Sequence, residues 1–206
     1  KALESASRYF DSNDDLTVHT LESVYGRESS FGKQLGTRGS TKAAGHFQLT
    51  PETAKRYGLS VSKKNDHRFD IDYASSAAAR YLKDLHTMFS KKTTLSGGKE
   101  TIPVNSVSER KKFALGAYAG GEGRIASAQH LAEQAGNDPQ LWSDVQKFLK
   151  SAGADEVTAR DIRQYLELVP AYEVEFAQKS PADNKMKHKE ARQGTYRCTE
   201  GHWVTI

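Results

Sequence analysis

An apolar stripe at helical spacing between residues 71 and 89 constrains the fold more than any other feature of this chain. Its members recur every three or four positions with polar residues between them: Ile71, Ala74, Ala78, Tyr81, Leu82, Leu85, Met88 and Phe89. This pattern is typical of a long amphipathic helix that buries one face. Asp70 stands directly before the stripe, where an aspartate can cap the free N–H groups of a helix start. The segment therefore predicts a long, capped helix.

Similar patterns along most of the chain predict a mostly α-helical fold. One helix is expected to begin at Asp14 or Asp15 and to end near Arg27. Thr50-Pro51 predicts the capped start of a short helix. Further helices are expected at 107–119, 122–135, 139–150 and 156–178, the last with a kink near Pro170. Residues 91–105 are expected to form a mobile basic loop.

The tail differs in character from this helical body. Residues 179–193 hold five Lys or Arg residues against two acids, which predicts a basic linker. Residues 195–199 and 202–206 then predict two strands, and an isolated hairpin of this kind is marginally stable. We therefore divide the chain into a helical domain at 1–178 and a basic linker with a short C-terminal extension at 179–206.

The totals exclude several classes of protein. The 206 residues suffice for one buried core, and no apolar run approaches the roughly 18 residues of a membrane span. Cys198 is the only cysteine, so an internal disulfide framework is excluded. The chain starts at Lys1 without a signal peptide, so we expect a mature or trimmed form. The net charge of +4 suits an anionic polymer but is common among ordinary proteins.

Glu28 is the strongest candidate for a catalytic group. It stands at the end of a predicted helix, directly before Ser29-Ser30-Phe31-Gly32. A helix C-terminus disfavours negative charge, and this favours the protonated carboxyl that a general acid needs. The alternative is a solvated glutamate at a helix end, because most glutamates are exposed.

A glycine-hinged apolar turn follows about twenty residues later. It runs Ala44-Gly45-His46-Phe47-Gln48-Leu49 and carries a single amide side chain. We expect it to face Glu28 across a site. The alternative for Gln48 is an ordinary loop amide.

Four segments occur in the order found in the soluble lytic transglycosylase (SLT) domain, family 1. They are Glu28-Ser29-Ser30, then Gly-His-Phe-Gln-Leu-Thr-Pro-Glu-Thr-Ala at 45–54, Ala-Ala-Ala-Arg-Tyr-Leu at 77–82 and Ala-Tyr-Ala-Gly-Gly-Glu-Gly-Arg-Ile at 117–125. Residues 162–166 are similar to a late Thr-Arg-x-Tyr-Val segment of that family. About residues 14–178 thus resemble an SLT domain, which implies a goose-lysozyme-like helical fold. The pattern is most similar to the membrane-bound lytic transglycosylase F branch.

The resemblance implies a peptidoglycan lytic transglycosylase, a lyase that acts on a polysaccharide. Glu28 would be its only catalytic acid/base. It would protonate the glycosidic oxygen between N-acetylmuramic acid and N-acetylglucosamine, and then deprotonate the muramoyl 6-hydroxyl. Attack of that oxygen on C1 gives a 1,6-anhydro end without the second carboxylate of most glycosidases. No cofactor is implied, and the histidines show no spacing typical of a metal site.

The same resemblance implies six substrate-binding residues: Ser29, His46, Phe47, Gln48, Tyr118 and Tyr165. Ser29 would orient Glu28, and Gln48 would hold an N-acetyl or neighbouring group. The two tyrosines would line the cleft; their alternative is a place in the core with satisfied hydroxyls. A packing or surface role is expected for His46 rather than a catalytic one.

The chain also departs from the family pattern. His46-Phe47 stands where the family has Leu-Met, and Ala119 stands where it has Asn, so an amide that would touch substrate or brace Glu28 is missing. Glu122 replaces a usual proline, and we expect it to be a solvated turn residue, with a second carboxylate near the cleft as the alternative.

Two rival functions remain at the level of sequence. Asp66, Asp70 or Asp72 opposite Glu28, roughly 6.5–9.5 Å away, would give a hydrolytic lysozyme that uses water; Asp70 is expected to be a helix cap instead. A non-catalytic peptidoglycan-binding or scaffold module would account for Ala119. The expected partners are peptidoglycan glycan strands and a cell-envelope or secretion-machinery protein, without nucleic acid. We expect a monomer in an extracytoplasmic place, either periplasmic or associated with the outer membrane.

Overall fold

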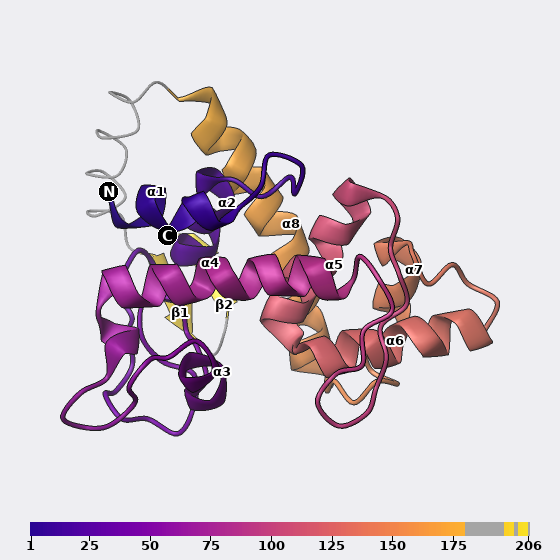
Figure 1. The fold of residues 1–206 in the computed structure, drawn as a ribbon, viewed down its shortest axis with the longest axis horizontal. Coiled ribbons are helices and arrows are strands. Elements are labelled where there is room, and N and C mark those ends of the chain that lie inside the picture. The colour runs from indigo at the N-terminus through magenta and orange to yellow at the C-terminus, as the bar shows by residue number, and fades with distance from the viewer. Residues whose placement is uncertain (180–195, 200–201, 206) are drawn as a thin grey trace. The chain divides into compact units, whose positions relative to one another are not determined.

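The computed structural model describes residues 1–179, 196–199 and 202–205 (Figure 1). Within them the chain is mostly helical, which confirms the predicted fold class. The α-helices are α1 Ala2–Ala6, α2 Val18–Ser29, α3 Pro51–Arg56, α4 Ile71–Met88, α5 Val107–Gly120, α6 Glu122–Gln134, α7 Trp142–Val145 and α8 Glu156–Gln178. Three short 3-10 helices lie between them: η1 Ser7–Tyr9, η2 His67–Phe69 and η3 Gln146–Phe148.

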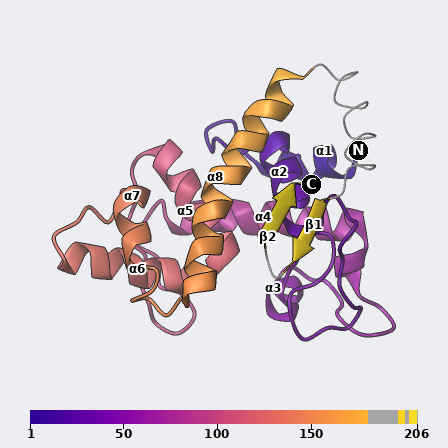
Figure 2. The ribbon, with the colours of Figure 1, turned by 180° about the vertical axis from the view of Figure 1, so that it is seen from behind.

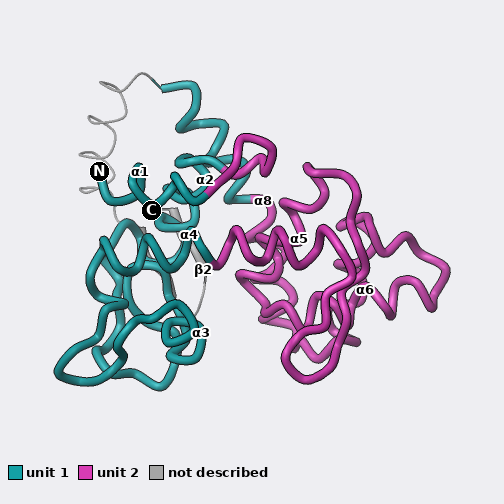
Figure 3. Tube along the Cα trace, in the orientation of Figure 1, with its two compact units in different colours: residues 1–9, 17–80, 168–206 teal, residues 10–16, 81–167 magenta. Residues whose placement is uncertain are grey.

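The described residues form two compact units (Figure 3). Unit 1 holds residues 1–9, 17–80 and the described residues from 168 onward, and unit 2 holds residues 10–16 and 81–167. Helices α4 and α8 each contribute one part to each unit. The domain boundary after residue 178 stays a prediction.

Helix α2, which carries Glu28, begins with a reciprocal cap. The Thr17 side chain accepts the backbone N–H of Thr20, and the Thr20 hydroxyl accepts the backbone N–H of Thr17. Such a capping box satisfies two otherwise unpaired donors. The prediction that Asp14 or Asp15 starts this helix is therefore wrong. In unit 2, Asp14 instead forms an ion pair with Lys83, with 2.6 Å between Oδ2 and Nζ.

Helix α4 confirms the prediction for its segment. The Asp70 carboxylate accepts the N–H groups of Asp72 at 2.9 Å and Tyr73 at 3.3 Å, so it is the predicted cap. The apolar stripe is buried, with no exposed surface on Ala74, Ala78, Leu82, Leu85 or Phe89. Thr50 likewise caps α3 as predicted, through the Thr53 N–H at 3.2 Å.

Unit 2 follows the predicted helices with two differences. Helices α5 and α6 meet at Gly121, whose φ of 87° ends one helix and starts the next, as predicted from the paired glycines. Helix α7 is much shorter than the predicted 139–150. Residues 91–105, expected to be mobile, are held by hydrogen bonds: the Thr101 hydroxyl donates to the Met88 carbonyl at 2.8 Å, and the His130 ring bonds the Glu100 carbonyl at 2.7 Å.

Near the C-terminus, β1 Tyr196–Thr199 and β2 His202–Thr205 pair in antiparallel register (Figure 2). This confirms the two predicted strands, whereas most of the predicted basic linker lies outside the described residues. Among the described helices, none combines the length and the apolar content that a membrane crossing requires.

Candidate active site

Glu28 lies in the last turn of α2 with a half-buried side chain. The chain then reverses through three consecutive residues in the left-handed region: Ser30 at φ 51°, Phe31 at φ 57° and Gly32 at φ 81°. For the two non-glycine residues this conformation is strained by about 1–3 kcal/mol each, and strain of this kind concentrates at functional sites. The sharp turn separates Glu28 from any continuation of its helix. In the sequence this turn corresponds to Ser-Ser-Phe-Gly at 29–32, and nothing in those residue types predicts left-handed backbones at Ser30 and Phe31.

Ser29 ties the reversing turn to the helix. Its hydroxyl donates to the Tyr25 carbonyl at 3.3 Å and accepts the Gly32 N–H at 3.0 Å. The residue has no exposed surface. This placement favours the predicted role of orienting Glu28 over a direct contact with substrate.

Tyr25 connects the end of α2 to the turn that carries Gln48. Its ring stacks on Phe47, with centroids 5.3 Å apart at 27°, and meets the edge of Phe31 at 5.7 Å and 89°. The Phe31 ring also lies over Gly26, where an added methyl group would come within 2.6 Å of it. Phe47 itself is completely buried, so its predicted substrate contact has no exposed surface to support it. The structure gives Phe47 a packing role.

Gln48 lies in a tight turn closed by an antiparallel bridge between Ala44 and Leu49. Its backbone is left-handed, with φ 49°, and its Nε2 donates to the Gly45 carbonyl at 2.9 Å. The side chain is half-buried, and both of its hydrogen bonds use Nε2 as the donor. No group in the described part of the chain donates to its Oε1. The turn thereby fixes an amide whose oxygen stays available as an acceptor.

His46 lies beside this amide with its ring tilted against Tyr25, at 5.7 Å between centroids. Burial lowers the pKa of His46, and the backbone of Phe69 and the Asp70 carboxylate offset this only in part. The imidazole is therefore neutral at neutral pH. Its Nδ1 is buried without a hydrogen-bond partner among the described residues.

Arg68 organises the loop that carries Gln48, and sequence reasoning missed it. The guanidinium has no exposed surface and donates to three backbone carbonyls, those of Ser40, Lys42 and Leu49, at 2.9, 2.9 and 3.1 Å. Its own carbonyl accepts the His46 N–H at 2.9 Å. Gly45 packs so closely on this backbone that an added methyl group would lie 2.0 Å from the Arg68 oxygen. Glycine is thus required at position 45.

Asp66 is the counter-charge of Arg68, with 2.8 Å between Oδ2 and Nη2 and neither side chain exposed. Burial raises the pKa of Asp66, but the hydrogen bonds from Arg68 and from the Gly39 N–H outweigh burial, so the net pKa lies below its ordinary value. Only the short spacing of Asp66-His67-Arg68 could have signalled this pair in the sequence.

In unit 2, Tyr118 and Tyr165 belong to one aromatic cluster. Their rings stack at 6.3 Å and 26°, and Tyr81 lies 5.3 Å from Tyr118. The Tyr81 hydroxyl donates to the Glu122 carboxylate at 2.8 Å, so Glu122, the first residue of α6, is not the solvated turn residue we predicted. Tyr165 is only 2 % exposed, so its ring lies in the core of unit 2, whereas Tyr118 is half-buried. Ala119 is exposed at the end of α5.

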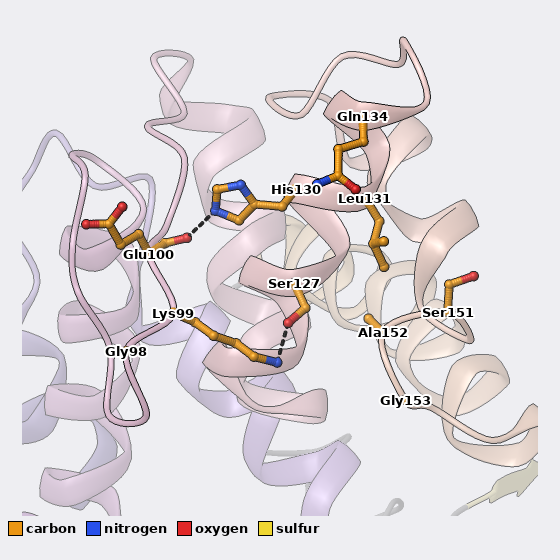
Figure 4. A pocket seen from close by; sticks show the side chains of 10 residues that line it. All are labelled: Gly98, Lys99, Glu100, Ser127, His130, Leu131, Gln134, Ser151, Ala152 and Gly153. Atoms are coloured by element: carbon orange, nitrogen blue, oxygen red, sulfur yellow. Dashed lines mark hydrogen bonds between the residues drawn. The ribbon is translucent and has the colours of Figure 1, made fainter.

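A hollow of about 690 Å³ lies in unit 2 between residues 98–100, helix α6 and residues 151–153 (Figure 4). Two bonds join residues that line it: Lys99 donates to the Ser127 hydroxyl, and His130 bonds the Glu100 carbonyl. None of the predicted site residues lines it. In the described part of the chain, no three His, Cys, Asp or Glu side chains gather as metal ligands would.

Comparison with known proteins identifies the family. The family model described as "Transglycosylase SLT domain" matches residues 8–141, about two thirds of the chain. Curated relatives include the "Membrane-bound lytic murein transglycosylase F" of Shewanella loihica, 33% identical over 135 residues that cover 66% of this chain and 24% of that protein. The protein of the same name from Cronobacter sakazakii is 30% identical over 135 residues, covering 66% and 22%. The protein of that name from Marinobacter nauticus is 32% identical over 109 residues, which cover 53% of this chain and 18% of that protein.

These matches span about a quarter or less of each relative. The helical architecture is consistent with the lysozyme-like fold that the resemblance implies, and the matched names agree with the F branch. The chain belongs to the transglycosylase SLT domain family.

Proposed function

We propose that this chain is the catalytic domain of a peptidoglycan lytic transglycosylase with Glu28 as its sole general acid/base. The observation that carries the proposal is the position of Glu28, half-buried at the reversed end of α2 in a chain of the SLT family. The word murein in the names of its relatives supports peptidoglycan as the substrate.

Glu28 first protonates the oxygen of the MurNAc-β-1,4-GlcNAc bond, which lets the GlcNAc unit leave. The resulting carboxylate then takes the proton of the muramoyl 6-hydroxyl as that oxygen attacks C1. The product is a 1,6-anhydro-MurNAc end, and no water is consumed. One carboxyl group serves as acid and then as base, so it must be oriented rather than paired with a second carboxylate.

The residues proposed to orient Glu28 and to bind substrate suit this scheme. Ser29 fixes the turn that follows the carboxyl group, and the Gln48 oxygen offers an acceptor for the N–H of an N-acetyl group. Tyr118, the half-buried tyrosine of unit 2, is proposed to contact the glycan, supported by Tyr165 behind it.

Three other carboxylates have structural partners, and this weighs against their use by a water-using lysozyme. Asp66 is paired with Arg68, Asp70 caps α4, and Glu122 accepts the Tyr81 hydroxyl. A carboxylate in such a role is poorly suited to activate a water as an inverting glycosidase requires.

We also propose an extracytoplasmic place of action, because murein is the substrate named for the relatives and they are described as membrane-bound. A monomeric state and a cell-envelope partner belong to the same proposal. Neither nucleic acid nor a cofactor is part of it.

The test is the product profile of digested peptidoglycan sacculi for the wild type beside Glu28→Gln. The wild type is expected to give anhydro-muramoyl ends, and Glu28→Gln is expected to lower their yield at least about 100-fold, the scale of a lost acid/base group. Glu52→Gln, an exposed glutamate of α3 in the same unit, is the matched control and should leave the yield unchanged. Hydrated reducing ends would instead identify a lysozyme. Wall binding without cleavage by the wild type would identify a binding module.

A further inference from the structure

Unit 1 contains a hollow of about 370 Å³ whose lining residues suit the binding of a sugar. It lies where α3 ends and α4 begins, and it is lined by Tyr57, Gly58, Leu59, Asp72, Tyr73, Ser76 and Arg80. None of the candidate catalytic or substrate-binding residues lines it. The reaction proposed for Glu28 therefore makes no use of it.

Tyr73 gives this hollow a fixed aromatic surface. The residue is 51 % exposed, yet its ring is stacked flat on His67, with centroids 4.0 Å apart and an angle of 8°. A large ring held in this way keeps one face covered while the rest of it stays available, and it loses little conformational entropy when a ligand binds. Tyr9, 47 % exposed, lies next to the lining residues, since the Ser76 hydroxyl reaches its Oη at 3.5 Å.

Arg80 supplies fixed hydrogen-bond donors. Its guanidinium lies over the rings of Tyr57 and Tyr9, at 5.4 and 5.8 Å from their centroids. Nη2 donates to the Tyr57 carbonyl at 2.8 Å, and Nε faces the Ser76 carbonyl at 3.4 Å. Within the described residues Nη1 has no hydrogen-bond partner, so its N–H groups are available to a ligand in the hollow.

The charges of the lining residues select the class of ligand. Arg80 is the only cation and Asp72, an exposed carboxylate, the only anion among them. This balance gives no net attraction for an anionic group such as a stem-peptide carboxylate. An uncharged ligand with many hydroxyl groups can bind both side chains, because its hydroxyl oxygens accept hydrogen bonds from Arg80 and its O–H groups donate to Asp72. The C–H face of a pyranose ring suits the negative face of an aromatic ring such as Tyr73.

We propose that this hollow is a second glycan-binding site, which holds an uncharged N-acetylhexosamine unit of the peptidoglycan strand apart from the bond being cut. The inference rests on the proposed function for its choice of polymer. Its consequence is retention of the enzyme on an insoluble, polymeric substrate, since two weak sites on one strand raise the overall affinity.

The experiment uses the full chain with Glu28→Gln, so that no substrate is consumed, and β-1,4-linked N-acetylglucosamine tetramers as the probe. Amide chemical shifts are expected to move in two groups, one around Gln48 and one around Tyr73 and Arg80. Tyr73→Ala should weaken binding for the second group roughly five- to tenfold, the scale of one aromatic contact, and leave the first group unchanged. Tyr73→Phe keeps the ring and should retain the affinity. Val174→Ala, which removes exposed apolar surface elsewhere in the unit, should change neither group.

The alternative outcomes are distinct. Shifts around Gln48 alone would overturn the second site and leave the proposed function standing. Shifts in neither group would count against both. Binding of a stem tripeptide at Tyr73 and Arg80 in place of the sugar would overturn the inference and assign the hollow to peptide carboxylates. A supporting result in sacculi is a lower retained fraction for the Tyr73→Ala, Glu28→Gln protein in co-sedimentation than for Glu28→Gln alone.

Discussion

At the scale of single residues, Gly45 and Gly58 form a natural comparison. Both have left-handed backbones, at φ 85° and 81°, but a methyl group at Gly45 would meet the Arg68 backbone at 2.0 Å, whereas at Gly58 nothing lies within 4 Å. Alanine should cost about 1–2 kcal/mol at either position for the conformation alone. We expect Gly45→Ala to lower the free energy of unfolding by at least about 2 kcal/mol more, because backbone must move. Urea denaturation of both variants measures the difference, and equal midpoints would contradict the close approach.

Ser29 makes a second prediction at this scale. Ser29→Ala leaves the half-buried Gly32 N–H without its acceptor, which should lower stability by about 1–3 kcal/mol. Because the turn follows Glu28 directly, the variant should also lower kcat more than it raises KM. Steady-state kinetics on soluble glycan strands separate the two parameters. A variant that loses stability but keeps kcat would restrict Ser29 to a folding role.

At the scale of elements, the buried pair of Arg68 and Asp66 holds the loop between residues 39 and 49. Arg68→Met leaves a buried carboxylate without its counter-charge and removes the donor of the Ser40 and Lys42 carbonyls, and removing one partner of such a pair typically costs about 3–5 kcal/mol. Arg38→Met is the matched control. Arg38 is exposed over the Phe69 ring, so its loss should cost no more than about 1 kcal/mol.

The same pair predicts an acid dependence. The pKa of Asp66 is lowered in the folded state, so its stabilisation is fully present above the ordinary value of 3.8 and is lost as the pH falls through the lower folded value. Unfolding midpoints of wild type and Arg68→Met should therefore converge below about pH 4. A constant gap between pH 7 and pH 3 would count against this role for the ion pair.

The elements also separate what sequence can predict from what it cannot. The bounds of α4, α5 and α6 follow from caps, glycines and periodicity, all of which act over a few neighbouring residues. The loop around Gln48 depends on Arg68, twenty residues further on, whose carbonyl partners leave no pattern in the sequence. Asp14 fails as a cap because Lys83, distant along the chain, engages its carboxylate. The resemblance implies a substrate contact for Phe47, because a matching position in a family motif does not reveal whether the ring is buried.

At the scale of the whole molecule, the fold extends beyond the segment that the family model matches. That match ends at residue 141, yet Ile162 and Tyr165 of α8 are buried in unit 2, and Phe176 of the same helix meets Phe31 in unit 1 at 6.3 Å. A methyl group at Gly120 would lie 2.5 Å from Ile162, so α5 and α8 are in close contact. Both units therefore include parts of α8.

A truncation series tests this extent. A chain that ends at residue 155 lacks α8 and should lose cooperative unfolding, because buried side chains of both units go with it. A chain that ends at 179 should keep the melting temperature within a few degrees if the predicted boundary after 178 is right. Thermal unfolding followed by circular dichroism gives both results. A large drop in melting temperature for the chain that ends at 179, relative to the full chain, would show that residues after 179 belong to the folded domain.

The dependence of overall stability on pH between 4.5 and 6.5 should reflect buried histidines. Burial lowers the pKa of His86 to about 4; the nearby Asp14 carboxylate, 3.7 Å from Nδ1, opposes this, whereas Arg110 and Lys83 add to it.

Unfolded chains bind a proton at histidine below about pH 6.5, but folded His86 does so only near 4. The unfolded state therefore holds more protons in this window, and the free energy of unfolding falls as the pH falls, by something of the order of 3 kcal/mol in total. The lowered pKa of His46 acts in the same direction in unit 1, while the carboxylates with lowered pKa values respond only below about pH 4. His86→Gln should flatten the plot of unfolding free energy against pH from 6.5 to 4.5 without removing the slope entirely. Parallel plots for wild type and variant would show that His86 gains its proton in the folded state as readily as in the unfolded chain.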